Sequence, residues 1–237
     1  MRQVAAVILA AGEAKRFRRS PDDTKLVAQL EGKPIVRHVA EAALASRAHP
    51  VLLVTGHAHA QVSSTLDGLM LERIHNHDPG AGLSASLKLA VCALPSTARG
   101  AVILLGDMPR IAPSLIDGLI DAFDAAPVER LAVVPVRGGR RGNPALIGRS
   151  LFAAVRMLEG DKGARDLIAA GRENVLELPV GDSAIEIDID TREDLRRHCH
   201  VAPPPRHGVR SACHPIRRRA WFRLATGGIA SPRRRRG

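Results

Sequence analysis

The sequence contains few aromatic residues, and this shortage argues against one class of function. It has no tyrosine, one tryptophan and four phenylalanines in 237 residues. Within the first 198 residues the aromatic side chains are Phe17, Phe123 and Phe152. Proteins that bind single-stranded nucleic acid without sequence preference stack the bases on aromatic side chains. We therefore do not expect the main body of the chain to bind nucleic acid.

Cysteine and long apolar runs are also scarce. The three cysteines are scattered and form no CxxC pair, so they indicate no disulfide framework and suit a reducing compartment. No apolar stretch approaches the ~20 residues that span a bilayer. The apolar stretch over 4–11 is followed by a charged segment where a signal peptide would have its cleavage site. These features predict a cytoplasmic protein that does not associate with membranes.

Acidic residues are missing from the last 42 residues of the chain. All 24 Asp and Glu lie within residues 1–195 together with 23 of the 35 Lys and Arg, which gives this part a formal charge of −1. The 12 remaining arginines give the C-terminal segment a charge of +12. This segment also lacks apolar periodicity and contains three consecutive prolines over 203–205. We expect one folded domain over residues 1–198 and a disordered Arg/Pro-rich tail over 199–237.

Short apolar runs alternate with segments of helical periodicity along the first 135 residues. The runs are typical of strands covered on both faces and lie at 4–9, 51–54, 101–105 and 131–134. The segments between them carry apolar stripes with helical spacing, such as Leu83, Leu87 and Val91. This alternation predicts βαβ units and an α/β fold, a three-layer α/β/α sandwich around a Rossmann-like, mostly parallel sheet.

The pattern loosens after residue 135, and the expected elements become shorter. A loop rich in turn formers covers 137–144. We expect short helices over 150–158 and 162–170 and short strands over 174–179 and 185–188. Thr191 has the character of an N-cap for a final helix.

Small residues follow the first predicted strand, where open α/β sheets bind their ligands. Leu9, Ala10, Ala11 and Gly12 would let the backbone approach a phosphate closely. Arg16 and Lys25 add cations suited to phosphate oxygens. The segment does not match GxxxxGK[ST], so a phosphate-binding loop and an ordinary strand-to-helix turn both remain open.

Carboxylates follow two later segments of the chain. Asp107 comes directly after the strand predicted at 101–105, and Asp188 and Asp190 alternate with isoleucines. Mg²⁺ prefers one or two carboxylates together with phosphate oxygens and water. If the segment at 185–188 packed beside the strand at 101–105, Asp107 and Asp190 could share one ion. The alternative for Asp107 is a helix cap.

These segments occur in an order that resembles the MobA-like nucleotidyltransferases, and within them the molybdenum cofactor cytidylyltransferases. The matching motifs are Leu9–Gly12 with Arg16 and Lys25, Gly82-Leu-Ser84-Ala-Ser86-Leu87, Gly106-Asp107-Met-Pro109, Arg141-Gly142-Asn143-Pro144, Gly160-Asp161-Lys-Gly-Ala-Arg165 and Asp188-Ile-Asp190-Thr-Arg-Glu-Asp-Leu195. The sequence departs from the family in the longer charged loop between Phe17 and Lys25 and in Arg192, where the family has proline. The basic tail has no counterpart in the family pattern.

The resemblance implies that CMP passes from CTP to the phosphate of molybdopterin, or of the molybdenum cofactor, with release of pyrophosphate. A molybdenum hydroxylase would then receive the product. Catalytic roles are implied for Arg16, Lys25 and Asp107. The implied nucleotide-binding residues are Leu9, Ala10, Ala11, Gly12, Arg16, Lys25, Gly82, Ser84 and Asp107. The implied acceptor-binding residues are Arg141, Gly142, Asn143, Pro144, Asp161 and Arg165. Mg²⁺ would bind Asp107, Asp190 and Asp188, and Ala11 favours CTP over GTP.

Several alternatives remain at this stage. A related transferase could use GTP, or a sugar or isoprenoid phosphate as acceptor. A noncatalytic nucleotide-binding module could carry a tail that binds polyanions. Residues 80–85 match a dinucleotide-binding fingerprint, although the segment before them is too polar for a buried strand. Histidine pairs at 57–59 and 75–77, and the Cys and His residues over 198–214, have spacings that could bind zinc.

Overall fold

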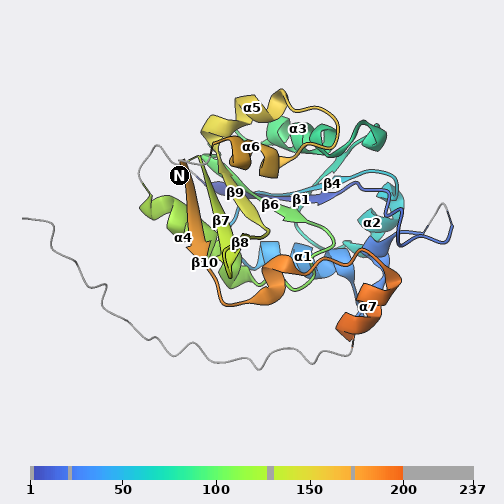
Figure 1. The fold of residues 1–237 in the computed structure, drawn as a ribbon. Helices are drawn as coiled ribbons and strands as arrows, with labels where there is room; N and C mark the ends of the chain where they lie inside the picture. The colour runs from blue at the N-terminus through green and yellow to red at the C-terminus, as the bar shows by residue number, and fades with distance from the viewer. Residues whose placement is uncertain (1–2, 21–22, 127–130, 172–173, 200–237) are drawn as a thin grey trace, which may run out of the picture. The chain divides into compact units, whose positions relative to one another are not determined.

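The computed structural model describes residues 3–20, 23–126, 131–171 and 174–199. An eight-stranded sheet lies between two layers of helices (Figure 1). Its order is β10-β7-β9-β6-β1-β4-β5, and β8 pairs with β7. The strands are β1 (Val4–Ala10), β4 (Val51–Thr55), β5 (Glu72–His75), β6 (Gly100–Leu105), β7 (Ala132–Arg137), β8 (Arg140–Arg141), β9 (Ala145–Gly148) and β10 (Val175–Pro179). A separate hairpin joins β2 (Gln29–Leu30) to β3 (Lys33–Pro34).

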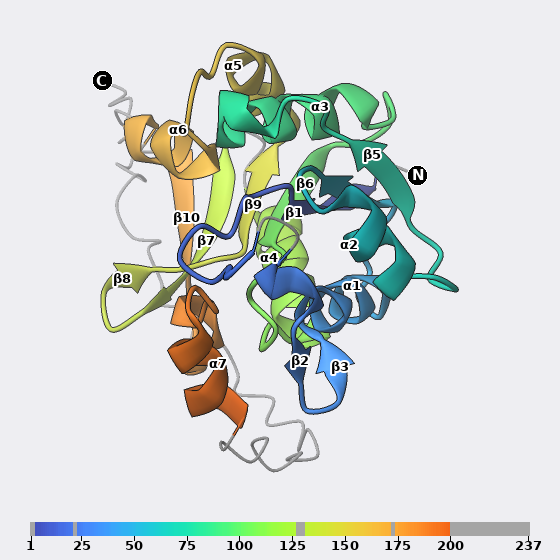
Figure 2. The same cartoon turned by 90° about the vertical axis from the view of Figure 1, so that its right-hand side faces the viewer.

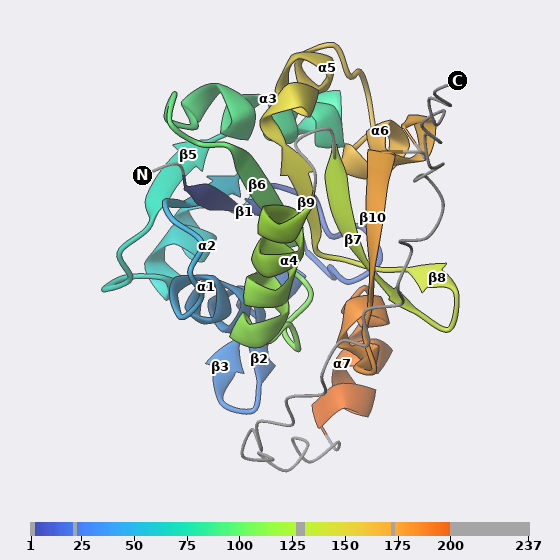
Figure 3. The ribbon, with the colours of Figure 1, turned by 90° about the vertical axis from the view of Figure 1, so that its left-hand side faces the viewer.

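The helices form the two outer layers, as the two side views show (Figures 2 and 3). One face of the sheet is covered by α3 (Leu83–Ala93), α5 (Phe152–Arg156) and α6 (Ala164–Ala170). The other face is covered by α1 (Ile35–Leu44), α2 (His59–Thr65) and α4 (Pro113–Ala125). The last described helix is α7 (Arg192–Cys199). Among the described helices, none is long and apolar enough to cross a membrane.

The central strand β1 explains why its sequence is aliphatic at every position. Ala6 and Ile8 contribute to a core shared with α1 and α4. The alternate residues Val7 and Leu9 contribute to a second core shared with α3 and α5. Because successive side chains of a strand point to opposite faces, a strand buried on both faces must be apolar throughout. The prediction of a doubly covered sheet is confirmed.

The four predicted apolar strands are β1, β4, β6 and β7, and β1 pairs in parallel with both β4 and β6. The sheet also contains an antiparallel strand, β9, between β6 and β7. β9 was not predicted from the sequence, because its four residues directly follow a segment rich in glycine and arginine.

The predicted strand at 185–188 is wrong. The chain instead forms a 3₁₀ turn, η5 (Ser183–Glu186), in which the side chain of Asp182 accepts a hydrogen bond from the backbone N–H of Ala184. Asp182 therefore caps a turn that competes with an extended strand. The chain still approaches β6 beyond this turn, because the Ile189 N–H donates to the carbonyl oxygen of Asp107 at 3.0 Å.

Ile189 also anchors this segment by packing. Its side chain is fully buried in a small cluster with Phe17, Leu30 and Ile35. The expected cap of the final helix is present, since the Asp194 N–H donates to Thr191 Oγ1 at 3.1 Å. The segment around Ile189 therefore packs against the loop that follows β1.

The compact unit that contains this sheet spans Met1–Ala202. The tail proposed for 199–237 lies outside the described residues except for Cys199. The predicted boundary at residue 198 and the disorder of the tail therefore stay predictions.

Candidate functional site

A cavity of about 460 Å³ opens at the carboxyl ends of β1 and β6. Its walls come from five separate parts of the chain. They are the loop after β1, the segment between β5 and α3, the end of β6, the loop before α6 and the segment before α7. Most residues implied for nucleotide binding line it, namely Leu9, Ala10, Ala11, Gly12, Arg16, Lys25, Gly82 and Asp107. Ser84 is buried and does not contribute to this lining.

Lys25 lies at the centre of the charged groups in this cavity. Its Nζ is 2.6 Å from Asp107 Oδ2 and 2.6 Å from Asp190 Oδ1. The lysine side chain is 13% exposed, so this bridge is largely shielded from solvent. Asp107 Oδ2 and Asp190 Oδ1 each lie 2.6 Å from the same nitrogen, so they are at most twice that distance apart. The structure thus brings together Asp107 and Asp190, although they are not on neighbouring strands.

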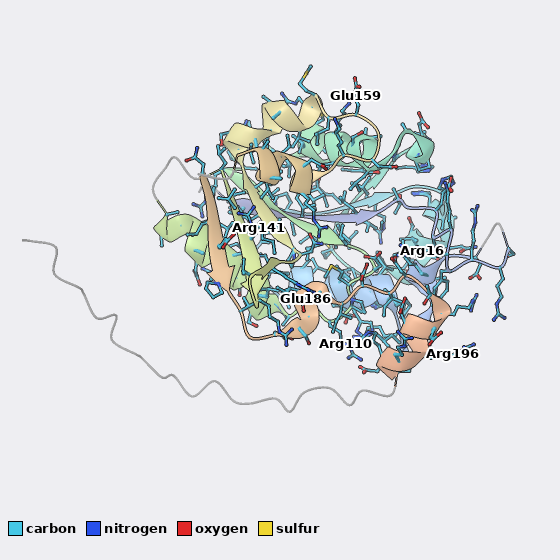
Figure 4. The ribbon with its side chains drawn as sticks, in the orientation of Figure 1. Arg16, Arg110, Arg141, Glu159, Glu186 and Arg196 are labelled. Carbon is cyan, nitrogen blue, oxygen red and sulfur yellow. The ribbon has the colours of Figure 1, made fainter. Side chains whose placement is uncertain are left out.

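A second cation contacts the same site from the outside. The guanidinium of Arg16 donates to Asp190 Oδ2, while most of the Arg16 side chain remains exposed. In Figure 4, Arg16 lies on the same side of the molecule as α7. Asp190 is therefore shared between a buried ammonium and a solvent-facing guanidinium.

The ionisation of Lys25 follows from these contacts. Burial lowers the pKa of the Lys25 ammonium, but the charge and hydrogen bond of Asp107, together with those of Asp190, outweigh burial and raise this pKa. Lys25 is consequently charged at neutral pH. It serves as a counter-ion that lets two carboxylates stay close together.

The carboxylates fit a divalent cation. Asp107 Oδ1 is buried and has no hydrogen-bond partner in the described residues. Asp107 Oδ2 and Asp190 Oδ1 both contact the ammonium group of Lys25. Such an unpaired buried oxygen beside two anionic oxygens matches the few carboxylate ligands that Mg²⁺ takes from a protein.

Asp188 is close enough to this pair to be influenced by its charge, but it does not line the cavity. Partial burial, and then the charges of Asp190 and Asp107, raise the pKa of Asp188. The described residues hold no group of three or more His, Cys, Asp or Glu placed to bind a metal ion. Of the three aspartates that the sequence suggested for the metal, only Asp107 and Asp190 line the cavity.

The loop after β1 presents its backbone to the cavity. Ala11 is only 6% exposed, and a Cβ added to Gly56 would lie 2.5 Å from the Ala11 carbonyl oxygen. The same added atom would lie 2.9 Å from the Ala11 methyl carbon. The methyl group of Ala11 is thus packed against Gly56. Any influence of Ala11 on base choice would therefore act through the position of the backbone.

The residues implied for acceptor binding are divided in space. Asp161 lines the cavity, whereas Arg141, Gly142, Asn143, Pro144 and Arg165 do not. Arg141 pairs with Glu177 of β10 through Nε at 2.8 Å and lies far from Arg16 in Figure 4. The Asn143 N–H donates to the carbonyl oxygen of Ile185 at 3.0 Å.

Asp161 reaches the cavity because its loop is fastened to the start of α3. The Ser84 N–H donates to the Gly160 carbonyl oxygen at 3.0 Å. Gly82 has a φ of +93°, and a Cβ there would lie 2.4 Å from the carbonyl carbon of Gly160. Glycine is thus required at 82 both by its backbone conformation and by this close approach. The 160–163 loop and the N-terminal end of α3 form one wall.

Several residues of the cavity wall could not be assigned a role from the sequence. Ser86 stands in a motif that was recognised, but it received no role. It lines the cavity and accepts a hydrogen bond at 3.0 Å from Asn76 Nδ2. Asn76 does not itself line the cavity, but it lies behind Ser86 as its hydrogen-bond partner.

Three of the four paired histidines lie side by side, but the described residues include no group placed to bind a metal ion there. The rings of His59 and His75 stack with their centroids 4.1 Å apart, and His77 tilts against His75 at 4.2 Å. His57 instead contacts Glu13 through Nε2 at 2.9 Å. Part of the segment 198–214 lies outside the described residues, so its proposed zinc site is untested.

Comparison with known proteins agrees with this architecture. A sequence profile of the MobA-like NTP transferase domain matches residues 6–175. The bifunctional protein GlmU of Geobacter metallireducens is 31% identical over 227 residues, which cover 91% of this chain and 46% of that protein. The chain spans less than half the length of the curated relatives it matches.

Solved structures resemble the chain over most of its length. The crystal structure of Rv0371c from Mycobacterium tuberculosis is 27% identical, has a TM-score of 0.71 and is covered over 98% of its length by 84% of this chain. A complex of Rv0371c with manganese is 26% identical with a TM-score of 0.71, and 84% of this chain covers 100% of it. These likenesses confirm the three-layer α/β/α fold.

Proposed function

Since the chain belongs to the MobA-like NTP transferase family, we propose that it transfers CMP from CTP to the phosphate of a molybdopterin-type acceptor. An oxygen of the acceptor phosphate would attack the α-phosphorus of CTP. The bond from that phosphorus to the oxygen bridging the α- and β-phosphates would break, and pyrophosphate would leave. Family membership supports nucleotidyl transfer, while cytosine and the acceptor rest on the motifs described above.

The observation that carries the proposal is the meeting of Lys25, Asp107 and Asp190 at the carboxyl end of the sheet. Transfer of a phosphoryl-type group needs little covalent help from a protein. It needs positioning of the reactants and neutralisation of the charge spread over the phosphate oxygens. In our proposal Lys25 and Arg16 neutralise the α-phosphate and the departing pyrophosphate.

Asp107 and Asp190 would hold Mg²⁺, which when bound supplies positive charge to the phosphate oxygens. The cavity itself argues for such a cation. Its wall carries three cationic side chains, those of Lys15, Arg16 and Lys25. It carries four acidic ones, those of Glu13, Asp107, Asp161 and Asp190. A triphosphate would meet a surplus of negative charge unless a cation enters with it.

The acceptor would approach from the side of Asp161, since the resemblance assigns its loop to the acceptor. Arg141, Asn143 and Arg165 do not line the cavity. They would contact the acceptor only if β8 and α6 moved towards the cavity. The product would pass to an enzyme such as a molybdenum hydroxylase.

The test is pyrophosphate release by the full chain with Mg²⁺ and molybdenum cofactor, comparing CTP with GTP and ATP. We expect release with CTP. Asp107→Ala should reduce the rate by about 10²–10³-fold, which is typical for loss of one electrostatic partner. Glu72→Ala, at an exposed position of the edge strand β5, is the matched control and should keep the rate.

The other possible outcomes would each change a different part of the proposal: the base, the acceptor or the transfer itself. Release with GTP alone would keep nucleotidyl transfer and overturn the choice of cytosine. Release only with a sugar phosphate or an isoprenoid phosphate as acceptor would overturn the molybdopterin assignment. No release with any of these pairs would contradict the proposal and favour a noncatalytic nucleotide-binding module.

A further inference from the structure

The loop after β1 meets the start of α7 through one arginine, Arg192. Its Nη2 donates a hydrogen bond to Oδ2 of Asp23. Its guanidinium also lies over the ring of Phe17, with the guanidinium carbon 4.7 Å from the ring centroid. Phe17 directly follows Arg16 in the sequence, and Asp23 lies two residues before Lys25. One side chain therefore contacts both ends of the segment that joins the two cations of the cavity.

Both residues that Arg192 contacts are also held by other partners. Phe17 is 2% exposed and belongs to the buried cluster that contains Ile189. Oδ2 of Asp23 accepts a second hydrogen bond, from the backbone N–H of Arg19 at 3.1 Å. Arg192 thus joins two fixed points of the loop rather than two freely moving side chains.

The position of Lys25 depends on the residues directly before it. Thr24 is buried, and its Oγ1 accepts a hydrogen bond from the backbone N–H of Leu26 at 3.4 Å. Lys25 is the first residue of the 3₁₀ turn η1 (Lys25–Val27), which Thr24 caps. Since only this buried cap separates Asp23 from Lys25, a contact that holds Asp23 also restricts the backbone of Lys25.

Arg192 contacts the loop from outside the cavity. It does not line the cavity, so it can influence a ligand there only through other residues. Inside the cavity, Arg16 and Lys25 both contact Asp190. In the proposed reaction these two cations turn to the phosphates and Asp190 to a metal ion. The contacts of Arg192 use none of these atoms, so they can persist when the nucleotide binds.

Two departures of the sequence from the family pattern meet at this contact. Arg192 stands where the family has proline, and Asp23 lies in the loop that is longer than in the family. The contact also has a cost, because Arg192 Nε is buried and has no hydrogen-bond partner among the described residues. A longer loop between two functional cations needs an additional contact if both cations are to keep their places.

We infer that Arg192 is a positioning residue, which holds Phe17 and Asp23 so that Arg16 and Lys25 stay directed at the triphosphate. The inference rests on the proposed function, in which these two cations neutralise the α-phosphate and the departing pyrophosphate. Their effect is largest on the charge that develops as pyrophosphate leaves. Loss of their positions should therefore lower kcat more than it raises the KM for CTP.

The test is pyrophosphate release by full-length variants with Mg²⁺, molybdenum cofactor and a range of CTP concentrations. Arg192→Gln removes the guanidinium. Arg192→Pro removes it with the residue that the family carries, and proline is tolerated at the first position of a helix, which Arg192 occupies in α7. We expect both variants to lower kcat by about tenfold or more and to change the KM for CTP by less than about threefold.

Arg99 provides a matched control for a purely structural role. Its guanidinium also pairs with an aspartate, Asp124, and lies 5.4 Å from the centroid of the Phe123 ring, and its Nε is likewise buried without a partner among the described residues. It precedes β6, whereas Asp107 follows β6 at the other end of the strand. Arg99→Gln should lower the melting temperature as much as Arg192→Gln, on the order of a few degrees, but keep kcat.

The partner of Arg192 gives an independent variant. Asp23→Asn should lower kcat as Arg192→Gln does, and it decides the matter if the variants at 192 do not fold. Because the two side chains act through one contact, the double variant should be no slower than the slower single variant.

The inference is overturned if the variants at 192 keep the wild-type kcat, if Arg99→Gln loses as much rate as Arg192→Gln, or if the rate losses of Asp23→Asn and Arg192→Gln multiply. Those results would leave the proposed transfer intact. A wild-type chain that releases no pyrophosphate would instead overturn the inference and the proposed function together.

Discussion

At the scale of single residues, Lys25 supplies the positive charge that lies between Asp107 and Asp190. Removing its charge should leave two carboxylates in need of a counter-ion. We predict that Lys25→Met binds Mn²⁺ about tenfold or more tightly than the wild-type chain when nucleotide is absent. Electron paramagnetic resonance of free Mn²⁺ measures this directly.

A matched control is available in the same cavity. Lys15→Met removes the same charge, but Lys15 contacts Glu13 at 3.1 Å and neither metal-binding carboxylate. It should change Mn²⁺ affinity little. If both variants gain equally, the bridge by Lys25 has no special role and only the total charge of the cavity matters.

Much of the residue-level chemistry could be predicted from the sequence, with limits that have physical causes. Lys25 and Asp107 could be named from the sequence as a phosphate-binding cation and a strand-end carboxylate, but the ion pair between them was not predicted. Asp190 could be named but not placed, because its position depends on one backbone hydrogen bond from Ile189. The hydrogen bond from Asn76 to Ser86 could not be predicted, because it joins the end of a strand to a helix that begins several residues later.

At the scale of elements, two glycines of the cavity should respond differently to alanine. Gly82 has a positive φ and faces Gly160 closely, whereas a Cβ on Gly12 would meet nothing within 4 Å. We predict that Gly82→Ala lowers the free energy of unfolding by roughly 2 kcal/mol or more. Gly12→Ala should keep the stability but weaken CTP binding, because its methyl group would enter the cavity.

Denaturant unfolding and nucleotide titration of the two variants check this pair. Equal stability losses for both glycines would contradict the account of the wall formed by α3 and the 160–163 loop. Unchanged CTP binding by Gly12→Ala would mean that the nucleotide does not approach the backbone after β1.

The start of α7 provides a pH-dependent contribution to stability. Asp194 Oδ2 accepts hydrogen bonds from the Thr191 hydroxyl at 2.7 Å and the Thr191 N–H at 2.8 Å. The hydrogen bond from the Thr191 hydroxyl is the main cause that lowers the pKa of Asp194. A lowered folded-state pKa stabilises the fold above the ordinary aspartate pKa, and this contribution is lost as pH falls through the folded-state value.

We predict that Asp194→Ala costs about 1 kcal/mol at pH 7, as loss of a helix cap does. The difference from the wild-type chain should shrink as the pH falls into the acidic range in which Asp194 is protonated. Urea unfolding across this range gives the measurement. Glu193→Ala, which removes an exposed pair with Arg197, is the control and should cost less at every pH.

The strand wrongly predicted at 185–188 illustrates why short elements were harder to predict than long ones. Its apolar residues suggested a strand, but Asp182 caps a tight turn at Ala184. The long apolar runs of β1 and β6 contain no Ser, Thr, Asn or Asp whose side chain could compete for the backbone in this way. The antiparallel β9 was missed because a four-residue strand carries little pattern.

At the scale of the whole molecule, charge and catalysis should be separable. Residues 1–195 carry a formal charge of −1, and the 12 later arginines account for the excess of positive charge. We predict that a chain ending at residue 202, the limit of the compact unit, keeps pyrophosphate release and loses retention on heparin. Rates and salt-dependent elution of the two chain lengths provide the measurement.

The truncated chain must retain α7 (Arg192–Cys199). Arg110 donates to the His198 carbonyl oxygen at 3.0 Å, so the last described helix contacts the segment that precedes α4. Loss of pyrophosphate release in a folded chain ending at 202 would show that the arginine-rich segment takes part in the reaction. Unchanged heparin retention would place the polyanion-binding surface within residues 1–202.

The contacts of residues 189–192 with the loop after β1 have a consequence for folding during protein synthesis. Asp190 contacts Arg16 and Lys25, Arg192 contacts Asp23 and covers the ring of Phe17, and Ile189 fills the cluster between them. A nascent chain therefore cannot complete the cavity until residues near 192 have left the ribosome. Until then the earlier strands can pair, but the emerging polypeptide has a nucleotide loop without its second carboxylate.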